Sequence, residues 1–327
     1  MRTRNTVAVA ATLAATVILA GCSSSSPASS GGGTPTSGDN TAKTTVNIGV
    51  GTATFVAPLS SDSFATSGLD LVQKPINSGA AAVPLLLNGQ LQFAAADSVS
   101  ALTAISKNVP LVIVAAAATS GSSAQNDATA VLVRGNSPIR SAKDLEGKKL
   151  AVNGIGNIAQ LGTAAAIDKL GGDSSKVQFV ELPPPAILPA IQNGTVDAAA
   201  ASEPAVTQGE AAGLRSLFSP TAEALPSVPL FVYVTSQSYL SQHRDVVTKF
   251  AQAMVKANNF AAQHPDFVRN FAVQNQKLAP ADASKLILPI FVPPTVQKPD
   301  MQRVVDLMVK YKTIGAPVDL NKAIFTP

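Results

Sequence analysis

One stretch of this sequence repeats itself at a constant offset. Gly49-Val50-Gly51 aligns with Gly154-Ile155-Gly156, and Asn88-Gly89 aligns with Asn193-Gly194 at the same offset of 105 residues. The same register also aligns Val72-Gln73 with Val177-Gln178, Pro84 with Pro189, and the alanines 94–96 with 199–201. An ungapped register of this length indicates a duplicated structural unit. The chain is therefore expected to fold into two similar lobes.

Each unit follows the same order of predicted elements. A strand (46–50 and 150–153) ends in Gly-x-Gly, a second strand follows (69–76 and 176–182), and then comes a helix (79–87 and 186–192). Both helices end in Asn-Gly, which suits a left-handed helix terminus. A short strand then leads to a polar end, Asp97-Ser98 or Ser202-Glu203. Strands that alternate with helices predict the α/β class, here two doubly wound lobes with parallel strands.

The chain after the second unit is expected to return to the first lobe. Apolar residues at helical spacing predict two covering helices near 246–257 and 301–311. Strands at 129–133 and 230–234 would then cross between the lobes and form a two-strand hinge. The expected division is 44–132 plus 235–327 for the first lobe and 133–234 for the second lobe.

The first 43 residues differ in composition from the rest of the chain. A basic start and the apolar run 7–20 are typical of a signal peptide, expected here at 1–21. The sequence Leu-Ala-Gly before Cys22 resembles the lipobox of bacterial lipoproteins, which implies that Cys22 is lipidated and becomes the mature N-terminus. Residues 22–43 are rich in Ser, Gly and Thr and are expected to form a flexible linker. The alternative is an ordinary secretory signal with an incidental cysteine.

Composition excludes several kinds of site. The net charge of +4 falls to +2 without Arg2 and Arg4, and the basic residues form no cluster, so nucleic acid is not an expected partner. One cysteine cannot form an intrachain disulfide, and with two distant histidines it does not make a zinc site. Neither a metal nor an organic cofactor is expected.

The polar strand ends predict a ligand site between the lobes. In open α/β sheets ligands bind beyond the carboxyl ends of the strands, and helix N-termini there suit a small anion. Asp97 and Glu203 could hold an amine of the same ligand. The alternative for each side chain is a helix cap or a turn. The predicted ligand residues are Gly51, Thr52, Ala53, Ser78, Gly79, Asp97, Ser98, Gly154, Gly156, Asn157, Pro184, Ser202 and Glu203.

Several motifs in fixed order resemble a known family. They are LLNGQLQFA (86–94), SAKDLEGKKLAV (141–152), LPPP (182–185), NGTVDAA (193–199), SEP (202–204) and PVDL (317–320). Together they are similar to the substrate-binding proteins of ABC transporters for nitrate, sulfonates and taurine, a group that includes binders of thiamine-pyrimidine precursors. The resemblance extends from about residue 46 to the C-terminus.

The resemblance implies a type II periplasmic-binding-protein fold without catalytic activity. The protein would be a monomer, anchored by lipid to the outer face of the cell membrane. It would capture a small anionic or zwitterionic nutrient, such as taurine, a sulfonate or nitrate, and deliver it to an ABC permease. A pyrimidine precursor as ligand, or a lipid-anchored sensor or interaction protein without a transport role, are the alternatives. The chain has no Trp, and neither His lies at a predicted strand end, so no cationic or aromatic ligand group is assigned.

The sequence gives little support for an enzymatic function. Thr54 stands where a dinucleotide-binding Gly-x-Gly-x-x-Gly motif needs its third glycine. A Gly-x-Ser-x-Gly nucleophile motif is missing, and the single cysteine is assigned to lipidation. A pyrimidine synthase of the same fold would require further cysteines and a suitably placed His. We therefore expect a binding protein, not an enzyme.

Overall fold

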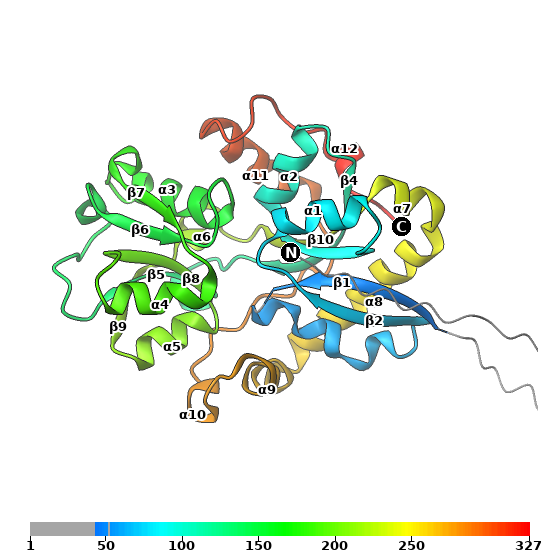
Figure 1. Cartoon of the computed structure of the whole chain (residues 1–327), viewed down its shortest axis with the longest axis horizontal. Coiled ribbons are helices and arrows are strands. Elements are labelled where there is room, and N and C mark those ends of the chain that lie inside the picture. The colour runs from blue at the N-terminus through cyan, green and yellow to red at the C-terminus, as the bar shows by residue number, and fades with distance from the viewer. Residues whose placement is uncertain (1–42, 52) are drawn as a thin grey trace, which may run out of the picture. The chain divides into compact units, whose positions relative to one another are not determined.

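The computed structural model describes residues 43–51 and 53–327. Two five-stranded sheets organise this part of the chain (Figure 1). The first sheet has the order β2-β1-β3-β10-β4 and the second has the order β7-β6-β8-β5-β9. The first contains β1 (Thr44–Val50), β2 (Leu69–Pro75), β3 (Phe93–Asp97), β4 (Leu111–Thr119) and β10 (Pro229–Ser236). The second contains β5 (Thr129–Arg134), β6 (Lys149–Val152), β7 (Gln178–Glu181), β8 (Ala198–Ser202) and β9 (Leu214–Phe218).

The repeat predicted from the sequence is present in the topology. The strands β1, β2 and β3 occupy the same places in the first sheet as β6, β7 and β8 in the second. The helices that follow β2 and β7 end alike, because Gly89 and Gly194 both take positive φ values, +77° and +78°. Only glycine adopts this left-handed conformation without steric cost. The two sheets with their helices are called the first and second lobe below.

Each sheet also contains one antiparallel strand, so the sheets are mixed, whereas parallel lobes were expected. β10 runs antiparallel to β3 and β4, and β5 runs antiparallel to β8 and β9. Because β5 pairs only within the second sheet and β10 only within the first, the expected lobe boundaries at 132/133 and 234/235 fall inside strands. The chain instead crosses in the segments 120–128 and 225–228, before each of these strands begins.

The two crossing segments are hydrogen-bonded to each other. The N–H of Ser120 donates to the carbonyl of Val228 at 3.0 Å, and the N–H of Val228 donates back to the Ser120 hydroxyl at 3.0 Å. The same hydroxyl donates to the carbonyl of Leu225. Ser120 is buried, so these bonds satisfy backbone groups that water cannot reach. The crossings are therefore paired and do not run as two independent linkers.

Helices cover both sheets. Those of the second lobe are α3 (Ile158–Lys169), α4 (Pro184–Gln192), α5 (Ala205–Ala211) and α6 (Pro220–Ala224). The others are α1 (Gly79–Leu87), α2 (Ser98–Ser106), α7 (Gln237–Gln242), α8 (Arg244–Gln263), α9 (Pro265–Gln276), α10 (Pro280–Ala283), α11 (Lys298–Lys310) and α12 (Leu320–Ala323). Short 3₁₀ segments are η1 (Thr54–Ser60), η2 (Asp62–Phe64), η3 (Ala124–Asn126), η4 (Lys143–Leu145) and η5 (Ser174–Lys176).

The predicted return of the chain to the first lobe is confirmed by the packing of α8 and α11. Val247, Phe250 and Met254 of α8 are buried against the first sheet, where Phe250 stacks on Phe93 with ring centroids 3.9 Å apart. Met301, Val304, Val305 and Met308 of α11 are buried on its other side. In each helix the apolar residues recur every three or four positions, which places them on one face. No helix of residues 43–51 and 53–327 is long and apolar enough to cross a membrane.

Candidate functional site

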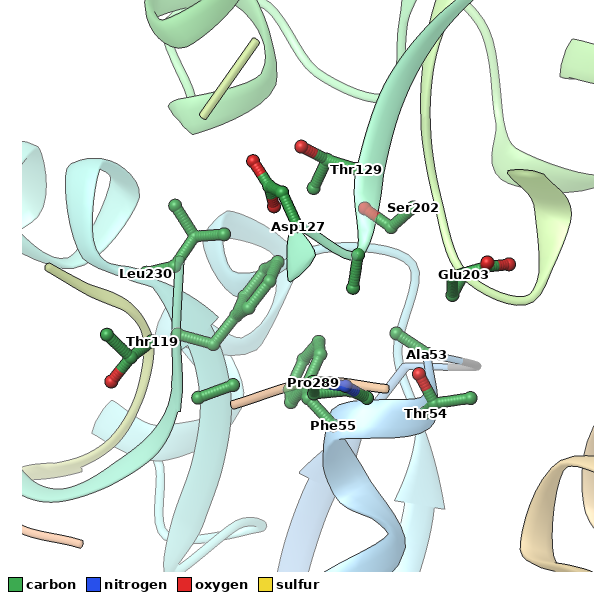
Figure 2. A pocket seen from close by; sticks show the side chains of 13 residues that line it. Ala53, Thr54, Phe55, Thr119, Asp127, Thr129, Ser202, Glu203, Leu230 and Pro289 are labelled. Atoms are coloured by element: carbon green, nitrogen blue, oxygen red, sulfur yellow. The ribbon is translucent and has the colours of Figure 1, made fainter. Parts of the chain in front are cut away.

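A small cavity lies where the carboxyl end of β8, the start of β5 and the beginning of η1 come together (Figure 2). Both lobes line the cavity. The residues on the side of the first lobe are Ala53, Thr54, Phe55, Ala118, Thr119, Leu230, Phe231 and Pro289. The residues of the second lobe and of the crossing segment that leads into it are Asp127, Ala128, Thr129, Ser202 and Glu203. The cavity has a volume of about 20 Å³ for water-sized spheres. This volume holds about one water molecule, so the lobes have to separate for a larger solute to enter, and they can close around it only with the lining side chains moved outward.

Two aromatic rings form the wall on the first lobe. Phe55 of η1 and Phe231 of β10 are stacked, with ring centroids 4.1 Å apart and an angle of 10° between their planes. Phe55 is buried, and it belongs to the same apolar cluster as the core of the first lobe. The two rings come together because η1 is the first element after β1, and β10 is the strand that returns from the second lobe into the same sheet.

Glu203 forms part of the opposite wall and is 2% exposed. Its carboxylate accepts hydrogen bonds from the Thr207 N–H at 3.0 Å, the Thr207 hydroxyl at 2.9 Å and the Ile287 N–H at 3.2 Å. Burial raises the pKa of Glu203, and the hydrogen bonds from Thr207 partly oppose this rise. Glu203 therefore joins the start of α5 to the segment that follows α10.

Asp127 lies at the end of the first crossing segment, two residues before the start of β5. Its Oδ2 atom accepts from the Thr221 hydroxyl at 2.6 Å and from the Ala222 N–H at 2.5 Å. The Thr129 hydroxyl is 2.7 Å from that of Thr221 and extends this chain of polar groups. Burial raises the pKa of Asp127, and the Thr221 hydrogen bond opposes the rise. The carboxylate thus fixes the first turn of α6 beside the cavity.

The charged side chains in the described cavity wall are all acidic. Among the described residues that line it, Asp127 and Glu203 are acidic, and none is Lys, Arg or His. Arg134, which lies in β5, instead donates to the carbonyl of Ile191 at 3.0 Å near the end of α4. Acidic groups together with hydroxyls favour a ligand that carries an amine or another hydrogen-bond donor.

Three of the residues predicted to bind ligand line this cavity. They are Ala53, Ser202 and Glu203. Nine others lie outside its lining: Gly51, Ser78, Gly79, Asp97, Ser98, Gly154, Gly156, Asn157 and Pro184. Thr52 and the lipidation residue Cys22 lie outside the described residues, so the structure does not place them.

Most of the nine have local roles at helix N-termini. Ser78, Asp97 and Asn157 accept from backbone N–H groups in the first turns of α1, α2 and α3, as the alternative reading predicted. Pro184 occupies the start of α4. A Cβ atom on Gly79 would lie 2.6 Å from that of Ala96, so this glycine permits close helix–strand packing.

The remaining four of the nine show no group directed at the cavity. The Ser98 hydroxyl is buried, and no described residue is its hydrogen-bond partner. A Cβ atom on Gly154 would lie 2.8 Å from the Asn157 amide nitrogen, Gly156 has a positive φ of 77°, and Gly51 follows the end of β1.

The lining residues that sequence reasoning missed come from the crossing segments and the aromatic wall. Thr129 lies in the strand expected at 129–133, and neither Asp127 nor Phe55 is among the predicted ligand residues. The position of Asp127 directly before a predicted strand was the available signal. Phe231 and Pro289 gave none, because their place depends on β10 and the C-terminal segment packing beside η1.

The described residues contain no group of three or more His, Cys, Asp or Glu side chains arranged to hold a metal ion. The carboxylates of the cavity accept from backbone N–H and hydroxyl donors, and each keeps further lone pairs that can accept from a ligand. Such a wall can bind a solute through hydrogen bonds and stacking.

Comparison with known sequences gives two matches. The profile of the family described as NMT1/THI5 like matches residues 53–267. The taurine-binding periplasmic protein of Escherichia coli (strain K12) is 30% identical over 200 residues, which is 61% of this chain. The matched region spans 60% of the length of that relative.

Solved structures share the architecture. An alkanesulfonate-binding protein from Xanthomonas axonopodis pv. citri, bound to MOPS, superposes with a TM-score of 0.71 at 19% identity and covers 86% of this chain and 98% of its own. The periplasmic nitrate-binding protein from Synechocystis PCC 6803 superposes with a TM-score of 0.73 at 13% identity and covers 86% of each chain. These likenesses confirm the expected two-lobe fold of periplasmic binding proteins.

Proposed function

Because this chain belongs to the NMT1/THI5-like family, we propose that it is the extracytoplasmic solute-binding protein of an ABC import system. The observation that carries this proposal is the cavity whose walls come from both lobes, with Phe55 and Phe231 on one side and Glu203 on the other. A solute held there touches both lobes at once and favours the arrangement that encloses it. The two paired crossing segments would serve as the hinge.

The proposed ligand is a small zwitterion of the taurine type. Glu203 and Asp127 would receive its amine, because carboxylates are strong acceptors and no described lining residue competes as a cation. The sulfonate end would be held by neutral donors such as the hydroxyls of Thr54 and Ser202, which line the same cavity. A simple anion such as nitrate would gain nothing from the carboxylates.

A precursor of the thiamine pyrimidine is the second candidate. The stacked pair of Phe55 and Phe231 presents an aromatic wall, and flat rings bind to such walls through offset stacking. The exocyclic amine of an aminopyrimidine would then donate to a carboxylate. A sensor or an interaction protein that binds such a solute without delivering it is the alternative role.

Thermal-shift titration of the purified protein tests the function and ranks the ligands. The panel is taurine, ethanesulfonate, nitrate and an aminopyrimidine alcohol. A ligand of the native state raises the Tm in proportion to the logarithm of its concentration. We expect a rise with taurine or the aminopyrimidine and little change with nitrate. Flat curves throughout, with no small molecule co-purified by mass spectrometry, would contradict the proposal.

The location and partners belong to the same proposal. Cys22 would carry the lipid that holds the protein at the outer face of the membrane, as a monomer that delivers its solute to the permease. A lipid anchor of this kind requires the Cys22 thiol, so Cys22→Ala should leave the protein in the soluble fraction after cell fractionation. Membrane association that persists in Cys22→Ala would contradict lipid anchoring through Cys22 but would not bear on solute binding.

A further inference from the structure

Helix α3 belongs to the second lobe, yet the first lobe holds it at both ends. We propose that Asp97 and Tyr311 of the first lobe are positioning residues that stabilise the arrangement in which the two lobes enclose the cavity. Neither residue lines the cavity, so their effect on a solute would be exerted through lobe closure. This inference goes beyond the proposed function and can be tested without a ligand.

The N-terminal end of α3 is bound by a buried carboxylate. The Oδ1 atom of Asp97, the last residue of β3, accepts from the Ile158 N–H at 3.1 Å. The same oxygen accepts from the Ser100 N–H of α2 at 2.9 Å. Asp97 is 9% exposed and lies between two helix N-termini that belong to different lobes. A negative charge is favoured at both, because the first N–H groups of a helix have no acceptor within it.

The C-terminal end of α3 is bound by a phenol. The Tyr311 hydroxyl, directly after α11, donates to Oδ2 of Asp168 at 2.7 Å. Asp168 is held in place by Ser174, whose N–H and hydroxyl donate to it at 2.7 and 3.0 Å. The acceptor is therefore fixed within the second lobe before Tyr311 reaches it.

Apolar contacts lie between these two hydrogen bonds. Ile158 and Leu161 of α3 are 4% and 5% exposed and belong to the same buried cluster as Leu102 of α2 and Val304 of α11. If the lobes separate, both apolar side chains and the Ile158 N–H become exposed to water. The contacts are thus made only in the enclosed arrangement and shift the equilibrium toward it.

A pair of substitutions at Ile158 isolates the hydrogen bond. Ile158 is the first residue of α3, where Pro is well tolerated, and Asn157 before it is extended as Pro requires. Ile158→Pro removes the N–H that binds Asp97, whereas Ile158→Val keeps it with a side chain of similar size. Tyr311→Phe removes the other bond, and Tyr239→Phe is its control because the Tyr239 hydroxyl forms no hydrogen bond to any described residue of the second lobe.

The readout is the distance between dyes on the two lobes, measured by single-molecule energy transfer without added solute. The dyes are attached at Gln90→Cys and Gln192→Cys, two exposed positions, with Cys22 replaced by Ala. We expect Ile158→Pro and Tyr311→Phe to populate a more open arrangement than their controls. With taurine as the probe, each should also accelerate dissociation by about tenfold, as for the loss of a hydrogen bond to a charged group.

Identical dye distances in Ile158→Pro and Ile158→Val, both folded by circular dichroism, would overturn the proposal. If Ile158→Pro does not fold, the dye distances of Tyr311→Phe and Tyr239→Phe are compared instead, and identical distances in these two variants would overturn the proposal. Failure of taurine to bind would count against the proposed function alone, because the dye distances are measured without it.

Discussion

Buried carboxylates in this protein are held by the first N–H groups of helices. Asp97 accepts from residues in the first turns of α2 and α3, Asp127 accepts from α6, and Glu203 accepts from Thr207 of α5. Burial raises the pKa of all three carboxyls. These side chains therefore link elements to one another, and two of them also form the cavity wall.

Glu203→Gln should make stability less dependent on pH. The pKa of Glu203 is raised in the folded protein, so its contribution to stability is fully present below its ordinary value of 4.5 and is lost as pH rises through the folded value. The amide stays neutral and lacks this loss. Urea unfolding between pH 4.5 and neutral pH should show a flatter curve for Glu203→Gln than for the wild type. Parallel curves for the two proteins would contradict this assignment.

Gly79→Ala should destabilise the fold. An added Cβ would lie 2.6 Å from the Ala96 Cβ and 2.9 Å from its Cα, so the helix α1 has to move away from β3. We expect a loss of about 1–3 kcal/mol in the free energy of unfolding, the usual cost of overpacking. Gly315→Ala is the matched control, because a Cβ there meets no atom within 4 Å. Equal urea midpoints for the two variants would show that Gly79 has another role.

At the scale of elements, the sequence repeat predicted the paired strands and helices well. The helix at 79–87 has the predicted bounds, and the strand ends at Asp97 and Ser202 lie where expected. Local patterns suffice there, because each strand and helix buries its own apolar face. The same patterns could not assign β5 and β10 to their sheets, since that choice depends on pairing with residues far along the chain, such as Thr129 with Ser202 and Phe231 with Asp97.

Arg134→Gln tests whether the arginine at the end of β5 serves the helix or the ligand. Its guanidinium donates to the carbonyl of Ile191 at 3.0 Å, and Val196 O lies at 3.4 Å, so it caps the end of α4. Loss of this charged donor should cost about 1.5–3 kcal/mol of stability and leave taurine affinity unchanged. A variant of normal stability that no longer binds taurine would instead place Arg134 at the ligand.

At the scale of the whole molecule, only part of the site could be predicted. Ala53 and Glu203 follow strands that end at the cavity and Ser202 is the last residue of one, so the rule for strand ends in open sheets finds them. Asp127, Phe231 and Pro289 are brought there by the crossing segments and by the C-terminal chain, which are not part of the repeat. The amine-binding role expected for Asp97 and Glu203 matches the wall at Glu203 only, because Asp127 and not Asp97 is the second carboxylate there.

The proposed function requires that a solute binds in the cavity between the lobes and that its amine is recognised there. Isothermal titration of the purified protein with taurine, and with ethanesulfonate as the matched compound without the amine, tests it most directly. Ala53→Trp fills the cavity, whereas Ala212→Trp adds the same ring at an exposed position in the second lobe. We predict saturable binding of one taurine per chain, much weaker binding of ethanesulfonate, and loss of taurine binding only in Ala53→Trp. Equal affinity for the two compounds would contradict recognition of the amine, and undiminished taurine binding by Ala53→Trp would contradict binding in this cavity.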